Sequence, residues 1–232
     1  MENFQVAIIG GGIVGVSTAW HLARAGCTDV VLLERAELTA GSTWHAAGNL
    51  PHFSNSQALM RVQQYGKTLY RQLHEASGGR GGLHETGALR ITRDEQRLQE
   101  FRRVRDIAQA IDIDMQIVSP ARMRDLHPLR SVDDLLDGLW DPLDGHVDPT
   151  SITNLLAEGA RQMGVRIYRN SPVTAVTRDD ADHWQLQIGA PEAARQINAR
   201  VVVNAAGFRA GEVAAMLGYT LPMANVEHQY LV

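Results

Sequence analysis

A glycine-rich turn between an apolar strand and a helix constrains the fold of this chain more than any other feature. Residues 4–9 read as a short buried strand, and a run of three glycines, Ile, Val and a fourth glycine follows. The run fits G-x-G-x-x-G on Gly10, Gly12 and Gly15. The first glycine permits a tight turn, the second lets the backbone approach a pyrophosphate, and the third lets a helix lie close to the sheet. A helix that ends near Gly26 would point its free N–H groups at the phosphates.

An acidic residue at the end of a second predicted strand strengthens this interpretation. Residues 30–33 read as the strand, and Glu34 lies 19 residues past Gly15. A carboxylate at this distance can accept hydrogen bonds from both ribose hydroxyls of an adenosine. The glycine motif alone is a weak signal, and Glu34 could be a solvated strand end. Strand, helix and acid together favour a dinucleotide site, which either NAD or FAD would fit because both contain an ADP half.

The loop after Glu34 favours a flavin. Residues 39–43 are small or carry hydroxyl groups, so they offer N–H and O–H donors to a second phosphate and a ribityl chain. Gly41 and the small residues 46–48 let the backbone lie close to a flat ring system.

The segment Gly-Ser-Thr-Trp-His-Ala-Ala-Gly at 41–48 resembles the flavin-attachment motif of a known family. That family is the sarcosine and dimethylglycine dehydrogenase branch of the D-amino-acid-oxidase superfamily of flavin-dependent amine oxidoreductases. The resemblance implies that His45 carries FAD covalently through the 8α-methyl group of the isoalloxazine, which requires a neutral imidazole nitrogen against that edge of the ring. The alternative is a hydrogen-bonded loop histidine, which is reasonable in a chain with nine histidines. The eight matching residues favour attachment.

The motif and the resemblance together assign an FAD-contacting set in the first fifty residues. Its members are Gly10, Gly12, Ile13, Val14, Gly15, Glu34, Arg35, Gly41, Ser42, Thr43, Trp44, His45, Ala46, Ala47 and Gly48.

The middle of the chain resembles the lid-like substrate domain of the family. We expect helices at 55–76, 94–110 and 120–126, and strands at 83–92, 114–118 and 135–141. Apolar residues at helical spacing give the first helix the stripe Leu59, Val62, Gly66, Leu69 and Leu73, and the second the stripe Leu98, Phe101, Val104, Ala108 and Ile111.

Residues 144–149 resemble the family's Asp-Gly-His-(Ile/Val)-Asp-Pro connector, which returns the chain to the FAD domain. Their D-x-H-x-D pattern also suggests a metal site, but the structural interpretation is preferred and no metal is predicted. Asp148 is a good N-cap and Pro149 a good first helical residue.

The last third of the chain returns to alternating helices and strands. A helix is expected at 149–163 and 210–217, and strands at 165–168, 173–177, 184–188, 197–204 and 224–232. The resemblance places Val173 against the adenine side of FAD, and Ala205 and Gly207 of an Asn-Ala-Ala-Gly turn under the pyrophosphate. It also gives His228 a catalytic place in the amine pocket, where the alternative is a histidine bonded to backbone.

Composition excludes several classes of protein. The net charge is −4, without the basic excess that nucleic-acid binding needs. The longest apolar runs are far too short to span a bilayer, so no membrane insertion is expected. The sequence enters its first strand almost at once, which leaves no room for a signal peptide, and it has a single cysteine, Cys27. A cytoplasmic location follows as the expectation.

The expected fold is α/β, a Rossmann-like FAD-binding domain with part of an α+β substrate domain inserted. Residues 1–50 and 142–220 are assigned to the FAD-binding domain, and 51–141 and 221–232 to the partial substrate domain, truncated at the C-terminus. The resemblance covers essentially the whole chain but only the first part of the family's catalytic unit. The chain is therefore interpreted as an N-terminal fragment whose partners are a small amine, the missing C-terminal part or an electron-transfer protein.

The resemblance implies oxidation of a secondary or tertiary N-methyl amino acid, with hydride passing from the N-methyl carbon to flavin N5. His228 would help to keep the amine deprotonated. Three alternatives stay open: a noncatalytic flavin-binding fragment, one subunit of a split enzyme, and an amino-acid oxidase with noncovalent FAD. The Trp44–His45 pair argues against the last.

Overall fold

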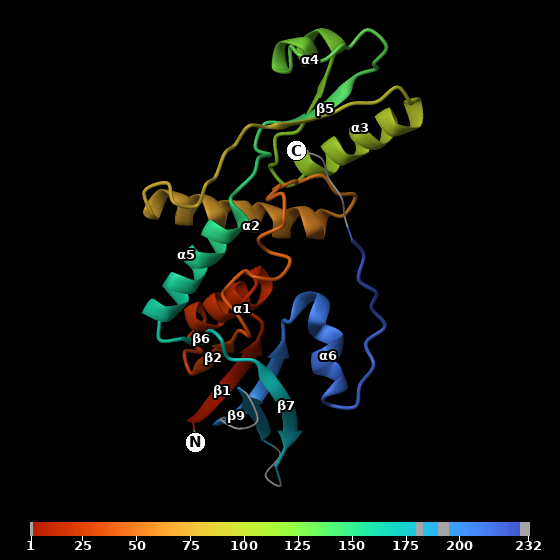
Figure 1. Cartoon of the computed structure of the whole chain (residues 1–232). Coiled ribbons are helices and arrows are strands. Elements are labelled where there is room, and N and C mark those ends of the chain that lie inside the picture. Colours follow the sequence, from red (N-terminus) through yellow and green to blue (C-terminus); the bar gives the residue numbers. More distant parts are fainter. Residues whose placement is uncertain (1, 180–182, 190–194, 228–232) are drawn as a thin grey trace. The chain divides into compact units, whose positions relative to one another are not determined.

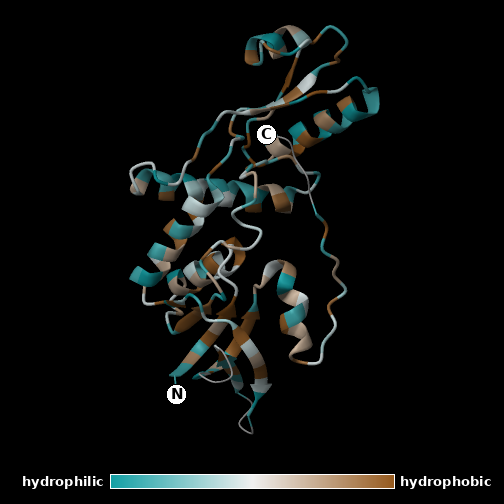
Figure 2. Ribbon diagram, viewed as in Figure 1, coloured by the Kyte–Doolittle hydropathy of each residue, from teal (hydrophilic) through white to brown (hydrophobic). Residues whose placement is uncertain are grey.

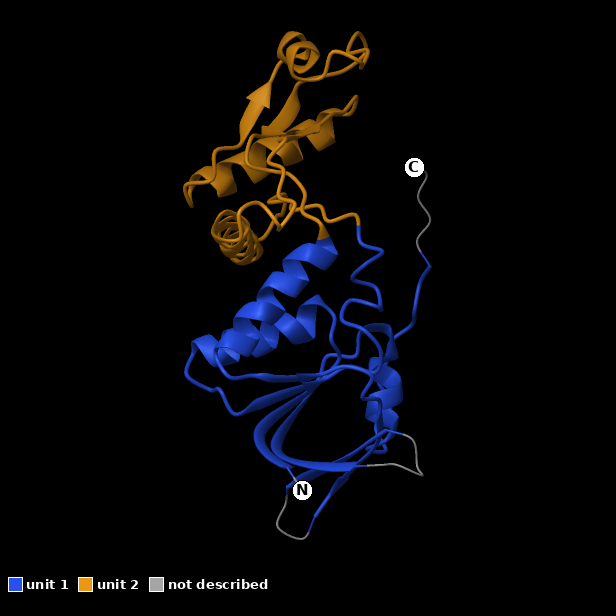
Figure 3. Ribbon diagram, turned by 60° about the vertical axis from the view of Figure 1, so that its left-hand side comes forward, with its two compact units in different colours: residues 1–46, 149–232 blue, residues 47–148 orange. Residues whose placement is uncertain are grey.

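The structure, a computed structural model, describes residues 2–179, 183–189 and 195–227. The chain divides into two compact units, which are shown in different colours in Figure 3. Unit 1 consists of residues 1–46 and 149–232, and unit 2 of residues 47–148.

Unit 1 is built on a mixed sheet with the strand order β6-β2-β1-β9-β8-β7 (Figure 1). The first four strands in this order run parallel, and β8 and β7 continue the sheet antiparallel. In chain order the strands are β1 (Glu2–Ile9), β2 (Val30–Leu33), β6 (Arg166–Tyr168), β7 (Val173–Arg178), β8 (Trp184–Ile188) and β9 (Arg195–Asn204). The predicted α/β class is confirmed.

The register of the parallel strands brings three strand ends together. Ile9, the last residue of β1, pairs with Leu33 on one side and with Asn204 on the other. Parallel strands end at the same edge of a sheet, so the glycine turn, Glu34 and the Ala205 turn all leave the sheet at that edge.

The helices of unit 1 are α1 (Ile13–Arg24), α5 (Pro149–Gln162) and α6 (Ala210–Ala215), with a short 3₁₀ turn, η2 (Gly207–Arg209). Helices α1 and α5 pack closely because Gly159 has no side chain: a Cβ there would lie 2.9 Å from the indole nitrogen of Trp20. All four residues of β2 are buried, as expected for a strand covered on both faces.

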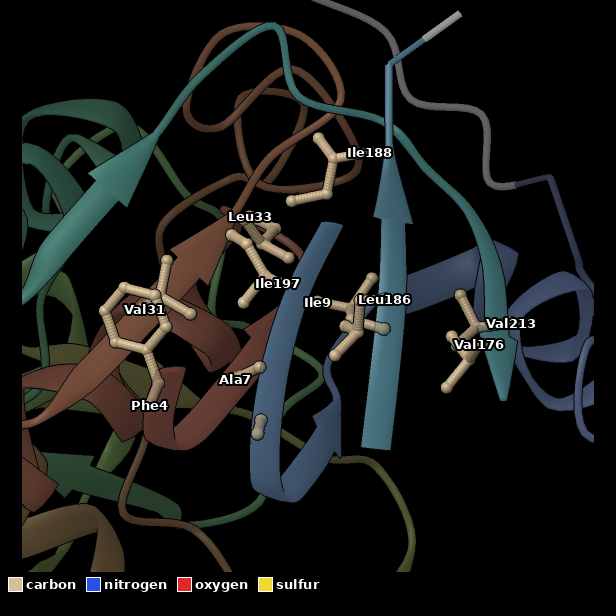
Figure 4. Packing of buried hydrophobic residues seen from close by; sticks show 11 residues of the cluster. Phe4, Ala7, Ile9, Val31, Leu33, Val176, Leu186, Ile188, Ile197 and Val213 are labelled. Carbon is tan, nitrogen blue, oxygen red and sulfur yellow. The ribbon is translucent and has the colours of Figure 1, made fainter. Parts of the chain in front are cut away.

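The main apolar cluster of unit 1 joins the parallel strands to β7, β8 and α6 (Figure 4). Its members are Phe4, Ala7, Ile9, Val31, Leu33, Val176, Leu186, Ile188, Ile197, Ala199 and Val213.

Unit 2 contains a small antiparallel sheet and three helices. The helices are α2 (Gln57–Ala76), α3 (Glu95–Gln109) and α4 (Pro120–Leu126), and the strands are β3 (Ala88–Arg90), β4 (Gln116–Val118) and β5 (Gly138–Asp141). Asp94 caps α3 by accepting a hydrogen bond from the Arg97 amide at 2.8 Å. The five residues predicted as the apolar stripe of this helix are all buried, so that stripe is confirmed.

The predicted stripe of α2 is wrong in part. Leu59 and Val62 are 49% and 65% exposed, whereas Leu69 of the stripe is buried together with Met60 and Lys67, which the stripe did not include. Helical spacing alone does not predict a buried lysine, because a lysine is buried only where internal acceptors bind its amine. Figure 2 shows both apolar and polar residues on the side of α2 that faces the viewer.

The strands predicted at 83–92, 114–118 and 135–141 are shorter in the structure, and the described part of the last predicted strand is unpaired. The strand expected at 83–92 is reduced to β3, because only these three residues pair with β5. The described part of the last expected strand, residues 224–227, is exposed and extended without a partner strand. Among the described helices, none combines the length and apolar character needed to cross a membrane.

Candidate functional site

The glycine turn after β1 is packed between the ends of its two neighbouring strands. The Gly10 amide donates to the Leu33 carbonyl at 2.9 Å, and the Ala205 amide donates to the Ile9 carbonyl at 2.9 Å. Gly10 has a φ of +119°, and a Cβ there would lie 2.3 Å from the Ala205 carbonyl oxygen. Only glycine satisfies both constraints. Two turns that the sequence assigned separately to the cofactor therefore touch each other.

The other two motif glycines are constrained by their surroundings. A Cβ on Gly15 would lie 1.9 Å from the Gly10 carbonyl oxygen, so the first turn of α1 sits directly on the glycine turn. A Cβ on Gly12 would lie 3.0 Å from Thr43 Oγ1, which brings the loop after β2 against the same turn.

The N-terminal end of α1 remains available to an anion. The first amides of a helix have no acceptor within the helix. Ile13 donates to Thr43 Oγ1 at 3.0 Å, and this leaves the amides of Val14 and Gly15 without an intrahelical acceptor. The first turn has no acidic residue to offset the positive end of the helix dipole. Val14 is 64% exposed, so the helix end is accessible in unit 1.

Glu34 is buried and ties two backbone segments together. Its Oε2 accepts from the Gly11 amide at 2.7 Å, and its Oε1 accepts from the Ala36 amide at 2.8 Å. This backbone role was not foreseen from the sequence. Each carboxylate oxygen can accept a second hydrogen bond, so the arrangement still fits a ribose diol. Arg35 beside it is exposed.

The loop at 39–48 folds back over the glycine turn. The Thr39 amide donates to the Gly11 carbonyl at 3.0 Å, and the Trp44 amide donates to the Thr39 carbonyl at 3.3 Å. Thr39 has a φ of 69°, a left-handed conformation that threonine rarely adopts. Thr43 is buried, whereas the four-residue run 44–47 and Ser42 are exposed, and Gly48 adopts a positive φ of 74°.

The geometry of His45 fixes its tautomer. Its Nδ1 lies 3.1 Å from the Gly41 carbonyl oxygen. A carbonyl oxygen only accepts, so Nδ1 carries the proton, and in the neutral ring Nε2 holds the free lone pair. The ring is packed against Trp44, with centroids 3.7 Å apart and planes tilted by 35°. His45 therefore presents a nucleophilic nitrogen on an exposed loop.

Phe208 belongs beside these residues although the sequence did not single it out. It is 44% exposed and lies in η2, directly after Gly207, whose φ is +59°. Its ring edge would be 3.7 Å from a Cβ on Gly41, so the Ala205–Phe208 turn meets the loop at 39–48. Only the pairing of β1 with β9 creates this contact, and no local pattern predicts it.

Val173 and His228 are the other predicted site residues. Val173 begins β7, is partly buried and pairs with Ile188. His228 lies outside the described residues. Within the part of the chain that the structure describes, no group of three or more His, Cys, Asp or Glu side chains is arranged to hold a metal ion.

These features define a dinucleotide-binding unit of the Rossmann type: a glycine turn, an accessible helix end, a buried acid and a small-residue loop at one sheet edge. Val14, Trp44 and Phe208 are exposed apolar side chains on the helix end, the loop and the Ala205–Phe208 turn, and they can contact a flat ring system. The residues thus fit FAD. The chain belongs to the family described as FAD dependent oxidoreductase, whose model matches residues 5–232.

Known proteins support the same assignment. The chain is 41% identical to dimethylglycine dehydrogenase of Rattus norvegicus over 231 residues, which is 100% of this chain and 26% of the relative. It is 35% identical to human sarcosine dehydrogenase, covering 98% of this chain and 25% of that protein. It is also 34% identical to the mouse pyruvate dehydrogenase phosphatase regulatory subunit, covering 98% and 26%. All three relatives are described as mitochondrial. The chain spans about a quarter of their length.

A solved structure shows the same fold. The L-proline dehydrogenase from P. horikoshii superposes with a TM-score of 0.82 at 25% identity, over 94% of this chain and 56% of that chain. The predicted Rossmann-like architecture is confirmed.

Proposed function

We propose that this chain forms the FAD-binding part of an enzyme that oxidises secondary or tertiary N-methyl amino acids of the sarcosine or dimethylglycine type. The observation that carries the proposal is the fixed tautomer of His45, within a segment that resembles the flavin-attachment motif. The 41% identity with dimethylglycine dehydrogenase supports the substrate class. Bound FAD would accept the hydride that leaves the N-methyl carbon, and water would hydrolyse the resulting substrate iminium to formaldehyde and the demethylated amine.

The residues of unit 1 would bind the cofactor in three steps along the chain. The glycine turn and the free amides of α1 hold the pyrophosphate, and the turn at Ala205 and Gly207 closes on it from β9. Glu34 accepts from the ribose, with Val173 on the adenine side. The loop at 41–48 then receives the ribityl chain and the ring. His228 is proposed to line the amine pocket. The proposed domains remain 1–50 with 142–220 for the cofactor and 51–141 with 221–232 for the substrate.

Attachment would join His45 Nε2 to the 8α carbon of the ring. The hydrogen bond from Nδ1 to the Gly41 carbonyl supports this step, because it directs the proton away from the reacting nitrogen. Bound FAD would supply the 8α carbon and would take up the electron pair of its C–H bond when that proton is lost, and an acceptor such as O₂ would then remove the pair. His45 would provide Nε2 for the new bond and would release its Nδ1 proton once the bond has formed. Trp44 limits rotation of the imidazole by packing against its face.

The attachment is tested by producing the chain with FAD present, denaturing it and illuminating a gel. We expect a fluorescent band from the wild-type chain and none from His45→Ala. His127→Ala, at an exposed histidine in unit 2, is the matched control and should keep the band. A band that persists in His45→Ala contradicts attachment at this residue. Flavin that dissociates from the denatured wild-type chain favours an amino-acid oxidase with noncovalent FAD.

A noncatalytic flavin-binding role is a second candidate, supported by the 34% identity with a protein described as a phosphatase regulatory subunit. Sarcosine or dimethylglycine with an artificial electron acceptor separates the two. Turnover by flavin-loaded protein supports the enzyme, whereas bound flavin that neither substrate reduces supports the second candidate. The electron-transfer partner and the cytoplasmic location also remain proposals, which cell fractionation and pull-down of the native protein would test.

A further inference from the structure

Unit 2 contains a buried cluster of three titratable side chains that the proposed oxidation does not use. His52 follows the flavin loop, Lys67 lies on α2, and Asp141 ends β5. They are 1%, 6% and 0% exposed, respectively. His52 Nδ1 lies 3.0 Å from Asp141 Oδ2 and 3.2 Å from Lys67 Nζ. Lys67 also donates a short hydrogen bond to the Leu143 carbonyl, and the Leu143 amide donates to Asp141 Oδ1 at 3.1 Å.

The two contacts of His52 Nδ1 impose opposite demands on one nitrogen. A carboxylate accepts and an ammonium donates, whereas Nδ1 either donates or accepts. If Nδ1–H donates to Asp141, the ammonium of Lys67 faces another donor. If Nδ1 accepts from Lys67, its lone pair faces the carboxylate. Both contacts become favourable when Lys67 is a neutral amine, because Nδ1–H then lies between two acceptors. The geometry therefore favours the form of the cluster in which Lys67 is a neutral amine.

The electrostatics of the buried groups point the same way. Burial lowers the pKa of Lys67, and the nearby carboxylates of Asp141, Asp144 and Glu85 offset only part of this effect. Burial alone would raise the pKa of Asp141, but its hydrogen bond from His52 and the charge of Lys67 outweigh burial and lower that pKa. Both side chains are thus held toward their deprotonated forms.

Several charged groups face the cluster. Lys67 and Arg71 approach from α2, Glu85 and Arg90 from the β3 side, and Asp141 and Asp144 from the β5 side. With Lys67 neutral, the surrounding charges are two arginines and three carboxylates. Protonation of Lys67 therefore acts through the local hydrogen bonds, because the resulting ammonium would face the Nδ1–H of His52 at 3.2 Å.

The cluster contacts residues 48–53, which are otherwise held by backbone hydrogen bonds and by Phe53. Residues 48–50 are joined to the chain after β5 by two backbone hydrogen bonds, Val147 N to Gly48 O at 3.0 Å and Leu50 N to Gly145 O at 2.9 Å. Beyond them the anchors are side chains. Phe53 packs on the apolar core of α3, with its ring centroid 6.0 Å from that of Phe101, and the Arg90 guanidinium carbon lies 4.6 Å from the Phe53 ring centroid. His52 supplies the buried polar contacts.

We propose that His52, Lys67 and Asp141 form an acid-sensitive lock in unit 2, which holds residues 48–53 against α2 and β5 and opens when the cluster takes up one proton. An opening that takes up one proton becomes about tenfold more frequent for each pH unit of acidification. The lock acts within unit 2 and is independent of the proposed oxidation.

Amide hydrogen exchange of the full chain between pH 5 and 8, corrected for the intrinsic rate at each pH, tests the lock. We expect exchange in residues 48–53 to rise about tenfold per pH unit of acidification, while α3 stays protected. His52→Asn replaces the ring nitrogen by an amide that can donate to Asp141 and accept from a charged Lys67 at the same time, so protonation of Lys67 no longer creates a conflict and exchange should be independent of pH. His127→Asn is the control at an exposed histidine and should behave like the wild type.

Two results would overturn the lock. One is corrected exchange at 48–53 in the wild-type chain that does not change with pH, a measurement that needs no variant to fold. The other is an unchanged pH dependence in His52→Asn. Lys67→Met provides an independent check, because without the ammonium the acid-driven opening should weaken by at least about tenfold at pH 5. Equal opening of Lys67→Met and the wild type at pH 5 would likewise contradict the proposal.

Discussion

Comparing Gly15→Ala with Gly66→Ala should separate the cost of the close contact between Gly15 and Gly10 from the gain in helix propensity. Gly15 and Gly66 are both helical glycines, in α1 and α2. A Cβ on Gly15 would lie 1.9 Å from the Gly10 carbonyl oxygen, whereas a Cβ on Gly66 would meet nothing within 4 Å. Helix propensity favours alanine at both positions by about 1 kcal/mol. Any difference between the variants therefore reports the contact with Gly10.

The size of the effect follows from this contact. A separation of 1.9 Å must open to the 3.4 Å of ordinary van der Waals contact, so α1 or the glycine turn must move by 1.5 Å. Backbone atoms cannot rotate away as side chains do. Strain of this kind costs about 1–3 kcal/mol, which exceeds the propensity gain. We expect Gly15→Ala to lose about 1–2 kcal/mol and Gly66→Ala to gain about 0.5–1 kcal/mol.

Urea unfolding followed by circular dichroism measures both free energies, and quenching of flavin fluorescence measures FAD affinity. Gly15→Ala should bind FAD at least about tenfold more weakly, because a displaced turn no longer presents its amides to the phosphates. Gly66→Ala should bind FAD like the wild type. If Gly15→Ala proves as stable as Gly66→Ala and binds FAD equally well, the close approach of helix and turn has no energetic consequence and the reasoning is refuted.

Three further substitutions test other parts of the structure. Phe101→Ala empties the centre of the unit 2 core and should cost about 3–5 kcal/mol in urea unfolding; a loss below about 1 kcal/mol would contradict its burial. Thr43→Val removes the hydroxyl that receives the Ile13 amide and should cost about 1 kcal/mol, with weaker FAD binding in the same fluorescence assay. The lowered pKa of Asp141 means that its ionised form stabilises the fold above pH of about 4, and this stability is lost as the pH falls through the folded-state pKa. Asp141→Asn should therefore be less stable than the wild type at pH 6, and acid unfolding curves should converge toward pH 2; parallel curves would contradict the assignment.

Local patterns predicted most elements of unit 1. The glycine spacing, the apolar run of β2 and the acid after it depend on neighbours in sequence, and the structure places them at one sheet edge. The stripe of α3 was predicted for the same reason, since helical spacing and an Asp94 cap are local signals. Strands that depend on a distant partner were less predictable. Residues 83–87 were expected to continue β3, but β5 offers only three partner residues.

Individual hydrogen bonds and contacts of the site were also not predictable from sequence patterns. Sequence spacing pointed to Glu34 as a ribose ligand, yet both of its oxygens also bind backbone amides of the turn and loop. Phe208 enters the site only because β9 pairs with β1. The tautomer of His45 depends on the direction of one carbonyl, Gly41, which a residue pattern does not encode.

Lys67 shows most clearly that partners distant in sequence decide which residues of a helix are buried. On helical spacing alone, Leu59 and Val62 should face the core and a lysine should face water. In the structure Leu59 and Val62 are exposed and Lys67 is buried. Lys67 can be buried because Leu143, 76 residues away, supplies a carbonyl acceptor, and His52 and Asp141 complete the surroundings of the amine. Burying the amine requires all of these partners at once, since losing one leaves a buried polar group unsatisfied. Helix α2 is therefore oriented by a polar cluster assembled from three distant segments, and its protonation must affect how firmly those segments hold together.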